Sequence, residues 1–400
     1  MNHDTDFKPH DASRTGLPLP DTAAQAHSAR LQRVIAEEMA DNGGSLSFAR
    51  YMELALYAPG LGYYSGGSPK LGAEGDFITA PELSPLFSRC LARQVAQVLA
   101  SLGGGDVLEV GGGSGAMAAD ILESLHAEDC LPRRYYILEL SADLRDRQRA
   151  LLKARLPDIQ ERVVWLESLP EPGFRGVIVA NELLDALPVH CFTITESGAA
   201  ELYVERRDEQ WSWSRAEPSS AELTERIEGL RRAGNLPLGY ISEINLAAEA
   251  WVASMADILA AGVLLLIDYG FPRREYYHPE RIRGTLMCHY RHRTHDDPFV
   301  LVGLQDITAH VDFTALAEAA YAADMKVAGY TTQAGFLLAL GITEFMNEAD
   351  DELTRLEWAQ QIKKLTMPHE MGELFKVLAL ARNFDESLQG FALRDLRHRL

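Results

Sequence analysis

Residues 107–115 read VLEVGGGSG, an apolar run that is interrupted by an acid and followed by a glycine-rich turn. The run is typical of a buried strand, and the AMAADILESL that follows is typical of a helix with Met117, Ile121 and Leu125 on one face. Glycines at such a strand-to-helix turn let the backbone approach a ligand closely, next to free helix N–H groups. The segment therefore predicts a nucleotide-type pocket at the carboxyl end of a β-strand.

The glycines alone do not identify the ligand, because Gly111, Gly113 and Ala116 also fit the dinucleotide fingerprint. Glu109 favours a different cofactor, since a carboxylate at the end of the strand would repel a pyrophosphate. S-Adenosylmethionine (SAM) has no phosphate, and its ammonium and sulfonium both favour a nearby carboxylate. A second acid, Glu139, ends the next apolar run, where a ribose diol would lie in either cofactor. We expect SAM; the alternative is a structural turn with no ligand.

Composition and charge exclude several classes of protein. The 400 residues are 47% hydrophobic, enough for a large core in one elaborated domain or two. The net charge of −20 argues against a surface for nucleic acid or anionic membrane and permits a basic partner. The four cysteines lack paired spacing and indicate reduced thiols. Because no apolar stretch is long enough to span a membrane, and the polar, acidic start is unlike a signal or transit peptide, we expect a cytoplasmic, bacterial protein.

From residue 106 onward, strands and helices alternate, which predicts a parallel sheet covered on both faces. Residues 189–215 interrupt this alternation with a pattern typical of an antiparallel hairpin. We expect strands at 106–110, 135–140, 162–166, 176–180, 262–270 and 325–331, and helices at 27–41, 47–57, 84–101, 115–126, 142–155, 221–232, 243–260 and 312–324. The expected organisation is a disordered leader at 1–26, a helical segment with a cofactor-covering loop at 27–101, a first part of the core at 102–188, an insertion at 189–240 and the rest of the core at 241–390.

Polar side chains follow the fourth strand, in the sequence ANELLDALP. In open α/β sheets the ligand crevice lies beyond the carboxyl ends of the strands, so Asn181, Glu182 and Asp185 are expected next to the glycine turn. If a helical turn begins here, the two acids share a face and could bind a guanidinium. Alternatively, Asn181 is a helix cap and Glu182 a first-turn acid that the helix dipole favours. Position favours the functional interpretation.

Several other polar residues have both a functional and a structural interpretation. In GDFITAPE, Asp76 and Thr79 could contact the cofactor, or Thr79 or Ser84 could cap the following helix. Glu243 could be a substrate acid, or equally a charge at the N-terminus of a helix. The segments CHYRHRTHDD and DITAHVD could suggest a metal site, but their spacing is unlike that of zinc ligands. We expect no metal.

These blocks together resemble a known family. MELALYAPGLGYY, GDFITAPELSPLF, LEVGGGSG, YYILELSADLRDRQ, NELLDALPVHCF, DITAHVDF, TTQAGFLLALGI and MGELFKVLAL are similar, in the same order, to blocks of the MidA-like SAM-dependent methyltransferases. The mitochondrial members of that family are the protein-arginine methyltransferase that assists the assembly of respiratory complex I. The resemblance extends over about residues 30–382.

The resemblance implies a class I methyltransferase fold: an α/β, Rossmann-like, seven-stranded and mostly parallel sheet with one reversed strand, an N-terminal helical segment, and hairpin and helical additions. It implies that Glu109, Gly111, Gly113 and Gly115 bind SAM and that Glu139 lies at the ribose. It also implies that GDFITAPE closes over the cofactor.

The expected activity is methylation of a protein arginine, with a subunit of respiratory NADH dehydrogenase as a possible acceptor. We hypothesise that Glu182 and Asp185, together with Glu243, form the acidic mouth that fixes the guanidinium and receives its proton. The alternatives are a SAM-binding assembly factor with little catalysis and a nicotinamide-dependent oxidoreductase. The sequence does not indicate the oligomeric state.

Overall fold

The computed structural model describes residues 16–66 and 78–400, and these form two compact units. Of the described residues, the first unit contains 16–66, 185–247 and 274–310. The second contains residues 78–184, 248–273 and 311–400. Each unit has its own hydrophobic core and its own sheets, and each is described separately.

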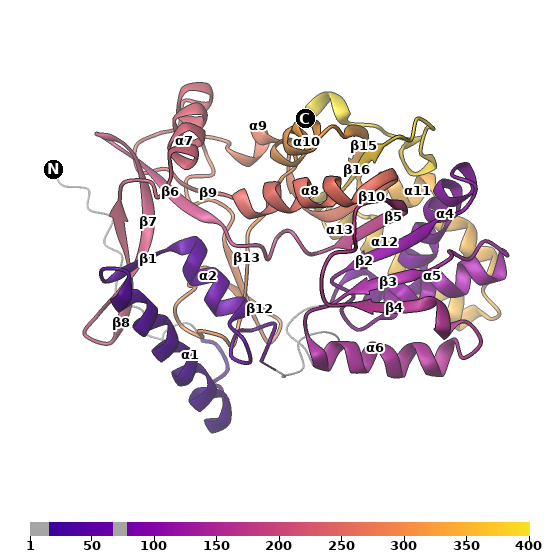
Figure 1. The fold of residues 1–400 in the computed structure, drawn as a ribbon, viewed down its shortest axis with the longest axis horizontal. Helices are drawn as coiled ribbons and strands as arrows, with labels where there is room; N and C mark the ends of the chain where they lie inside the picture. The colour runs from indigo at the N-terminus through magenta and orange to yellow at the C-terminus, as the bar shows by residue number, and fades with distance from the viewer. Residues whose placement is uncertain (1–15, 67–77) are drawn as a thin grey trace. The chain divides into compact units, whose positions relative to one another are not determined.

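The second unit is built on one large sheet (Figure 1). Seven strands follow one another in the order β15-β16-β10-β5-β2-β3-β4, and β14 pairs with the end of β10. Only β16 runs antiparallel to its neighbours, so the sheet is mostly parallel, as predicted. The strands are β2 (Asp106–Val110), β3 (Tyr135–Leu138), β4 (Val163–Leu166), β5 (Phe174–Asn181), β10 (Leu259–Phe271), β14 (Val311–Asp312), β15 (Lys326–Thr332) and β16 (Phe375–Arg382).

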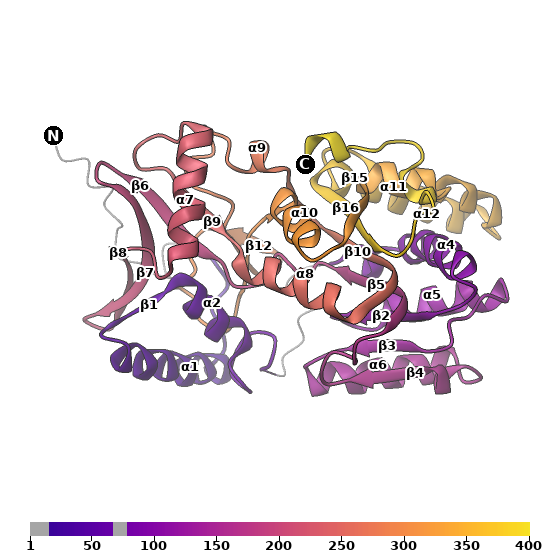
Figure 2. The same ribbon diagram turned by 45° about the horizontal axis from the view of Figure 1, so that its top comes forward.

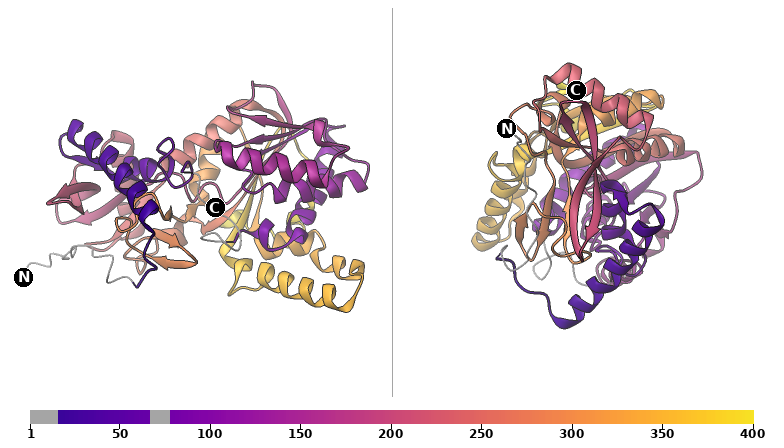
Figure 3. Two further views of the ribbon diagram at one scale, coloured as in Figure 1. Left: turned by 90° about the horizontal axis from the view of Figure 1, so that it is seen from below. Right: turned by 90° about the vertical axis from the view of Figure 1, so that its left-hand side faces the viewer.

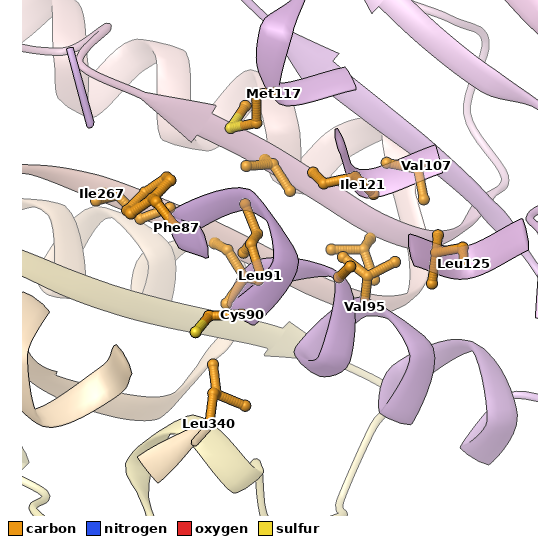
Figure 4. Close-up of a cluster of buried hydrophobic side chains, with 14 of the residues drawn as sticks. Phe87, Cys90, Leu91, Val95, Val107, Met117, Ile121, Leu125, Ile267 and Leu340 are labelled. Carbon is orange, nitrogen blue, oxygen red and sulfur yellow. The ribbon is translucent and has the colours of Figure 1, made fainter. Parts of the chain in front are cut away.

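Helices cover this sheet because their apolar stripes and the almost wholly apolar central strands bury each other. Helices α4 and α5 pack against each other (Figure 2), and Figure 4 shows side chains from both helices gathered with Val107 of β2 and Ile267 of β10. The helices of this unit are α3 (Ala80–Leu83), α4 (Pro85–Ser101), α5 (Ala116–Ala127), α6 (Ala142–Arg155), α8 (Leu246–Ile258), α10 (Phe313–Ala322), α11 (Gln333–Ala339), α12 (Glu352–Thr366), α13 (Met371–Leu374) and the 3-10 turns η2 (Gln160–Arg162), η3 (Ile342–Glu348), η4 (Gln389–Phe391) and η5 (Arg397–Arg399).

The first unit contains two smaller antiparallel sheets. In the larger one, β1-β7-β6-β9 are neighbours and β8 pairs with β7; the two long strands β6 and β7 are drawn in rose in Figure 3. The three-stranded sheet has the order β12-β11-β13. The strands are β1 (Ser45–Ser47), β6 (His190–Thr195), β7 (Gly198–Arg207), β8 (Gln210–Ala216), β9 (Ile241–Ile244), β11 (Met287–Tyr290), β12 (Arg293–His295) and β13 (Asp306–Thr308), and the helices are α1 (Thr22–Asp41), α2 (Phe48–Tyr57), α7 (Ala221–Gly234) and α9 (Arg273–Tyr276).

The alternating part of the chain agrees closely with the prediction, and the additions differ from it. Helix α1 begins at Thr22, where Asp21 caps it, so it extends into the 1–26 segment that we expected to be a disordered leader. Residues 189–240 do not form a free-standing insertion, because β7 pairs with β1 from the N-terminal segment. Conversely, α4 of the predicted N-terminal segment belongs to the core of the second unit. No helix in the described ranges is long and apolar enough to cross a membrane.

Candidate functional site

The glycine turn joins β2 to α5 at the carboxyl end of the parallel strands. Gly111, Gly113 and Gly115 have φ values of +76°, +52° and +87°, a region that residues with a Cβ rarely adopt. A Cβ at Gly111 would also lie 3.1 Å from Leu183 Cδ1. The turn therefore requires glycine for its backbone conformation, and α5 begins directly after it at Ala116.

Glu109 lies beneath this turn, in β2, and is 1% exposed. The Tyr135 hydroxyl, from β3, donates a hydrogen bond of 2.6 Å to Glu109 Oε2. Burial raises the pKa of Glu109 to about 8; the hydrogen bond from Tyr135 opposes this shift, and the nearby Glu139 adds to it. The carboxyl group of Glu109 therefore titrates near physiological pH. A cation at this site would favour its ionised form.

Glu139 follows β3, also at the carboxyl edge of the sheet, and is almost fully buried. Its Oε1 accepts the backbone N–H of Ser141 at 2.9 Å, and its Oε2 accepts Gln148 Nε2 at 3.4 Å. Burial raises the pKa of Glu139, and these hydrogen bonds oppose the rise. A carboxylate has about four acceptor sites, so the side chain can accept further donors such as the hydroxyls of a diol.

Asn181 ends β5, the strand next to β2, and Glu182 follows it. The register pairs Val110 with Ala180, which brings these two residues beside the glycine turn, as the contact of Leu183 with Gly111 also shows. In the part of the chain that the structure describes, Asn181 Oδ1 is buried and has no hydrogen-bond donor. A buried acceptor of this kind costs free energy unless a ligand or water supplies a donor.

Glu182 has a left-handed backbone, with φ of +49°. Its N–H donates to Ile267 O at 2.9 Å, and its Oε1 accepts Ala80 N at 3.3 Å and Asn181 Nδ2 at 3.2 Å. Residues 182–189 form bends and turns and no helix, so the interpretation of Asn181 as a helix cap and Glu182 as a first-turn acid is wrong. Left-handed non-glycine residues are strained and cluster at functional sites.

Asp185 does not share a helical face with Glu182, because the chain between them is irregular. The boundary between the two units falls between Leu184 and Asp185. In the second unit, Leu184 N donates to Asp268 Oδ2 at 2.9 Å and so anchors the end of this segment to β10. In the first unit, Asp185 is buried, and its carbonyl accepts Ala309 N at 2.9 Å.

The GDFITAPE segment is described only from residue 78. Asp76 lies outside the described residues, and its predicted cofactor contact is therefore not placed. Thr79 precedes α3 without a capping hydrogen bond from its side chain, and the first N–H of α3 is the Ala80 group that contacts Glu182. Ser84 caps α4 instead, accepting Leu86 N at 3.2 Å. The capping interpretation therefore holds for Ser84, and the role of Thr79 at the cofactor stays a prediction.

Glu243 lies in strand β9 of the first unit and not at the start of a helix, which corrects the expected helix boundary. It is 1% exposed, and its carboxylate accepts two backbone N–H groups and two hydroxyls, from Thr285, Leu286 and Tyr276. A Cβ at Gly284 would lie 2.0 Å from its Oε1. This geometry favours a structural anchor for residues 284–286 over the predicted contact with substrate.

The two segments considered for a metal have other structures. Residues 287–295 form a hairpin of β11 and β12, turned at Arg291 and His292 with positive φ. Asp312 caps α10 by accepting Thr314 N and Ala315 N. The described residues contain no group of three or more His, Cys, Asp or Glu side chains that could hold a metal ion.

Two residues of this edge are absent from the sequence-based prediction. Tyr135 opens β3 and the block YYILELSADLRDRQ, but the sequence pattern gave it no role. Gln148 could have been found, because Leu144, Gln148 and Leu152 are spaced four apart and place one polar residue on an apolar helix stripe. The edge thus combines a glycine turn that leaves room for a ligand, buried carboxylates and the unmatched Asn181 acceptor. These features fit a cationic nucleoside such as SAM better than a phosphate-bearing cofactor.

Comparison with known families agrees with this geometry. Residues 90–331 match the model of a family described as S-adenosyl-L-methionine-dependent methyltransferase. The chain is 28% identical over 375 residues to the protein arginine methyltransferase NDUFAF7, mitochondrial, of Danio rerio, covering 84% of this chain and 83% of that protein. It is 27% identical over 388 residues to the protein of the same name from Homo sapiens, covering 87% and 82%.

Comparison with solved structures gives a stronger similarity. A protein of Burkholderia thailandensis, solved bound to S-adenosyl-homocysteine, is 46% identical, with a TM-score of 0.92 over 96% of this chain and 100% of that one. A native crystal structure from the same organism gives a TM-score of 0.90 at 46% identity over the same shares of the two chains. The similarity therefore extends over both units of the chain and includes a structure that holds the demethylated cofactor.

Proposed function

Because this chain belongs to the S-adenosyl-L-methionine-dependent methyltransferase family, we propose that it transfers the methyl group to the side chain of an arginine in a protein. The single observation that carries the proposal is the position of Glu182. This carboxylate stands at the end of β5, next to the glycine turn, on a strained backbone. The names of the relatives, which are protein arginine methyltransferases, support the same acceptor.

The cofactor site is assigned to residues at the carboxyl edge of the second unit. We propose that the glycine turn and Glu109 hold the amino-acid end of SAM, that Glu139 accepts the ribose hydroxyls, and that Asn181 Oδ1 accepts a further donor. When bound, SAM supplies an electrophilic methyl group on a sulfonium. The protein's task is to hold the acceptor nitrogen in line with that methyl group and to exclude water.

Arginine methylation demands an acid beside the acceptor. The guanidinium is delocalised and protonated, so its nitrogens are weak nucleophiles until a carboxylate fixes the charge on the opposite side. As the new N–CH₃ bond forms and the S–CH₃ bond breaks, the nitrogen must lose a proton. Glu182 Oε1 accepts hydrogen bonds from Ala80 N and Asn181 Nδ2. These contacts orient the side chain, and we propose that it binds the guanidinium.

Asp185 belongs to the first unit, and its role stays a prediction from the sequence. Glu243 is not part of the proposal because its carboxylate already accepts four donors within the first unit. The net charge of −20 suits a basic acceptor. A subunit of respiratory NADH dehydrogenase, which the family resemblance implies, is the acceptor to test first. We also propose that the reaction takes place in the bacterial cytoplasm.

The experiment is transfer of radiolabelled methyl from SAM. The full chain is incubated with a lysate of host cells that lack its gene, so that the natural acceptor is unmethylated, and with purified NADH dehydrogenase subunits. We expect one labelled protein band, and peptide mass spectrometry should place the added methyl group on arginine. The Glu182→Gln variant serves as the matched negative control.

Each other outcome overturns a defined part of the proposal. A label on lysine or on a carboxylate would exclude the arginine acceptor and retain the methyltransferase. Tight SAM binding without any labelled protein would favour a SAM-binding assembly factor. A labelled small molecule in the filtrate would exclude a protein acceptor.

A further inference from the structure

Gln148 lies in the middle of α6 and is fully buried. Its Nε2 donates to Gly113 O at 2.9 Å and to Glu139 Oε2 at 3.4 Å, and its Oε1 accepts the indole N–H of Trp165 at 2.9 Å. One side chain thus connects the glycine turn, the acid that ends β3 and strand β4. All of its polar groups are engaged, as a buried amide requires.

Helix α6 is fixed to Glu139 along its first two turns. Ser141 caps the helix by accepting Leu144 N, and its own N–H donates to Glu139 Oε1. One turn on, Arg145 Nη1 donates to Glu139 O at 3.0 Å, and one further turn on, Gln148 reaches Glu139 Oε2. Both carboxylate oxygens therefore have a donor from this segment. The orientation of the carboxylate is set before any ligand arrives.

Two glycines of the turn make this approach possible. A Cβ at Gly112 would lie 3.1 Å from Gln148 Nε2, and one at Gly115 would lie 3.1 Å from Gln148 Cγ and 3.3 Å from its Cα. Gly112, which also leaves room for Ile137, and Gly115 thus allow α6 to pack directly against the turn. Gly111, Gly113 and also Gly115 are required by their left-handed backbone. The glycines of the motif thus serve both the backbone conformation of the turn and the packing of α6, and the sequence alone does not distinguish these two roles.

We propose that Gln148 is a positioning residue for SAM, which holds the carboxylate of Glu139 at a fixed place relative to the glycine turn. In the proposed site, the amino-acid end and the ribose of the cofactor contact two elements that are separated in the chain by α5 and β3. The Gln148 amide donates to both the glycine turn and Glu139 and so sets the distance between them. This inference rests on the proposed role of Glu139 at the ribose. Preorganisation of this kind strengthens binding because less freedom is lost when the ligand is bound.

The test uses calorimetric titration of the full chain with S-adenosyl-homocysteine. Gln148→Leu keeps the size of the side chain and removes both donated hydrogen bonds, so we expect it to weaken binding by about 10-fold or more, as loss of a hydrogen bond to a charged group does. Trp165→Phe is the matched control, because it removes the bond on the far side of the amide and keeps both bonds that Gln148 donates. It should weaken binding by less than about 2-fold. Gln148→Met replaces Gln148→Leu if the leucine variant does not fold, which a thermal melt without ligand will show.

A double-mutant cycle separates positioning from general stability. If Gln148 acts through Glu139, Gln148→Leu should weaken binding much less in a Glu139→Gln background than in the wild type. Equal fold-losses in both backgrounds, or wild-type affinity of Gln148→Leu, would overturn the inference. Unchanged affinity of Glu139→Gln alone would instead refute the ribose assignment, which distinguishes the failure of the proposed site from the failure of Gln148.

Discussion

The Tyr135 hydroxyl donates to Glu109 Oε2 at 2.6 Å, and this bond is buried between two neighbouring strands under the glycine turn. It is a short hydrogen bond to a group whose pKa burial raises to about 8. The acid that defines the motif is therefore part of the sheet interior as well as of the proposed cofactor site. Through the protonation of Glu109, both the stability of the fold and the affinity for the ligand should depend on pH.

The first prediction concerns stability. The native pKa of Glu109, about 8, exceeds its ordinary value of 4.5, so between these values the native state holds a proton that the unfolded state has lost. The contribution of Glu109 to stability is thus fully present below about pH 4.5 and is lost as pH rises to 8, at about 1.4 kcal/mol per pH unit. Glu109→Gln should abolish this part of the pH dependence. Urea unfolding at pH 5.5 and 8.5 measures the free energy of unfolding of the wild type and of Glu109→Gln. If the difference between these two free energies does not change with pH, the prediction is refuted.

A second prediction follows for binding. SAM carries two positive charges, which the ionised form of Glu109 attracts and the protonated form does not. Binding of SAM should therefore release a proton from Glu109. For the same reason, the affinity for SAM should increase from pH 6 to 8. Calorimetry in buffers of different ionisation enthalpy counts the released protons. Glu109→Gln should bind more weakly and show a smaller release. The same proton count in both proteins would assign the released proton to another group.

Gly111→Val should abolish SAM binding. Valine at φ +76° is strained by about 1–2 kcal/mol, and its side chain would meet Leu183 Cδ1 at the place where the ligand is expected. Gly103→Val is the matched control, because Gly103 has φ of +69° and open space around a Cβ. The Gly103→Val variant should lose thermal stability because of the same backbone strain, and it should retain the wild-type affinity for SAM. Calorimetric binding by Gly111→Val at wild-type strength would remove the turn from the cofactor site.

Glu182→Gln should lower turnover by about 100-fold, the usual effect of losing a proton acceptor, with SAM affinity within about 3-fold of the wild type. Glu209→Gln is the control, since Glu209 also has a left-handed backbone, with φ of +66°, but lies in the exposed turn between β7 and β8. It should leave turnover unchanged. An equal loss of turnover and of SAM affinity in Glu182→Gln would reassign the residue to the cofactor.

Glu243→Gln tests whether the buried acid of the first unit is structural. An amide would direct N–H groups at the donors of Thr285 and Leu286, so we expect a loss of about 2–3 kcal/mol in the free energy of unfolding, with the turnover of the folded fraction retained. Glu225→Gln, on the exposed face of α7, should change stability by less than about 0.5 kcal/mol. Lost turnover at unchanged stability would restore Glu243 to the catalytic group.

Local sequence patterns predicted the α/β core well because its strands and helices have clear periodicity. The strand predicted at 106–110 is β2 with the same bounds, and the helix predicted at 142–155 is α6 with the same bounds. The prediction failed where partners are distant in the chain. Glu243 was placed near a helix start, but pairing with β6 makes it part of a strand. The segment 27–101 was taken as one piece, although it divides between two cores.

By itself, the sequence determined the cofactor class: an acid, a run of glycines and a second acid, each placed directly after an apolar run, specify a local turn whose shape depends on neighbouring residues only. The tertiary structure alone decided which groups surround those acids. Tyr135 reaches Glu109 across 26 positions, and Gln148 reaches Gly113 across 35, because strand register and helix packing bring them together. No periodicity records such contacts, since they depend on how whole elements pack and not on the residues beside them in the chain.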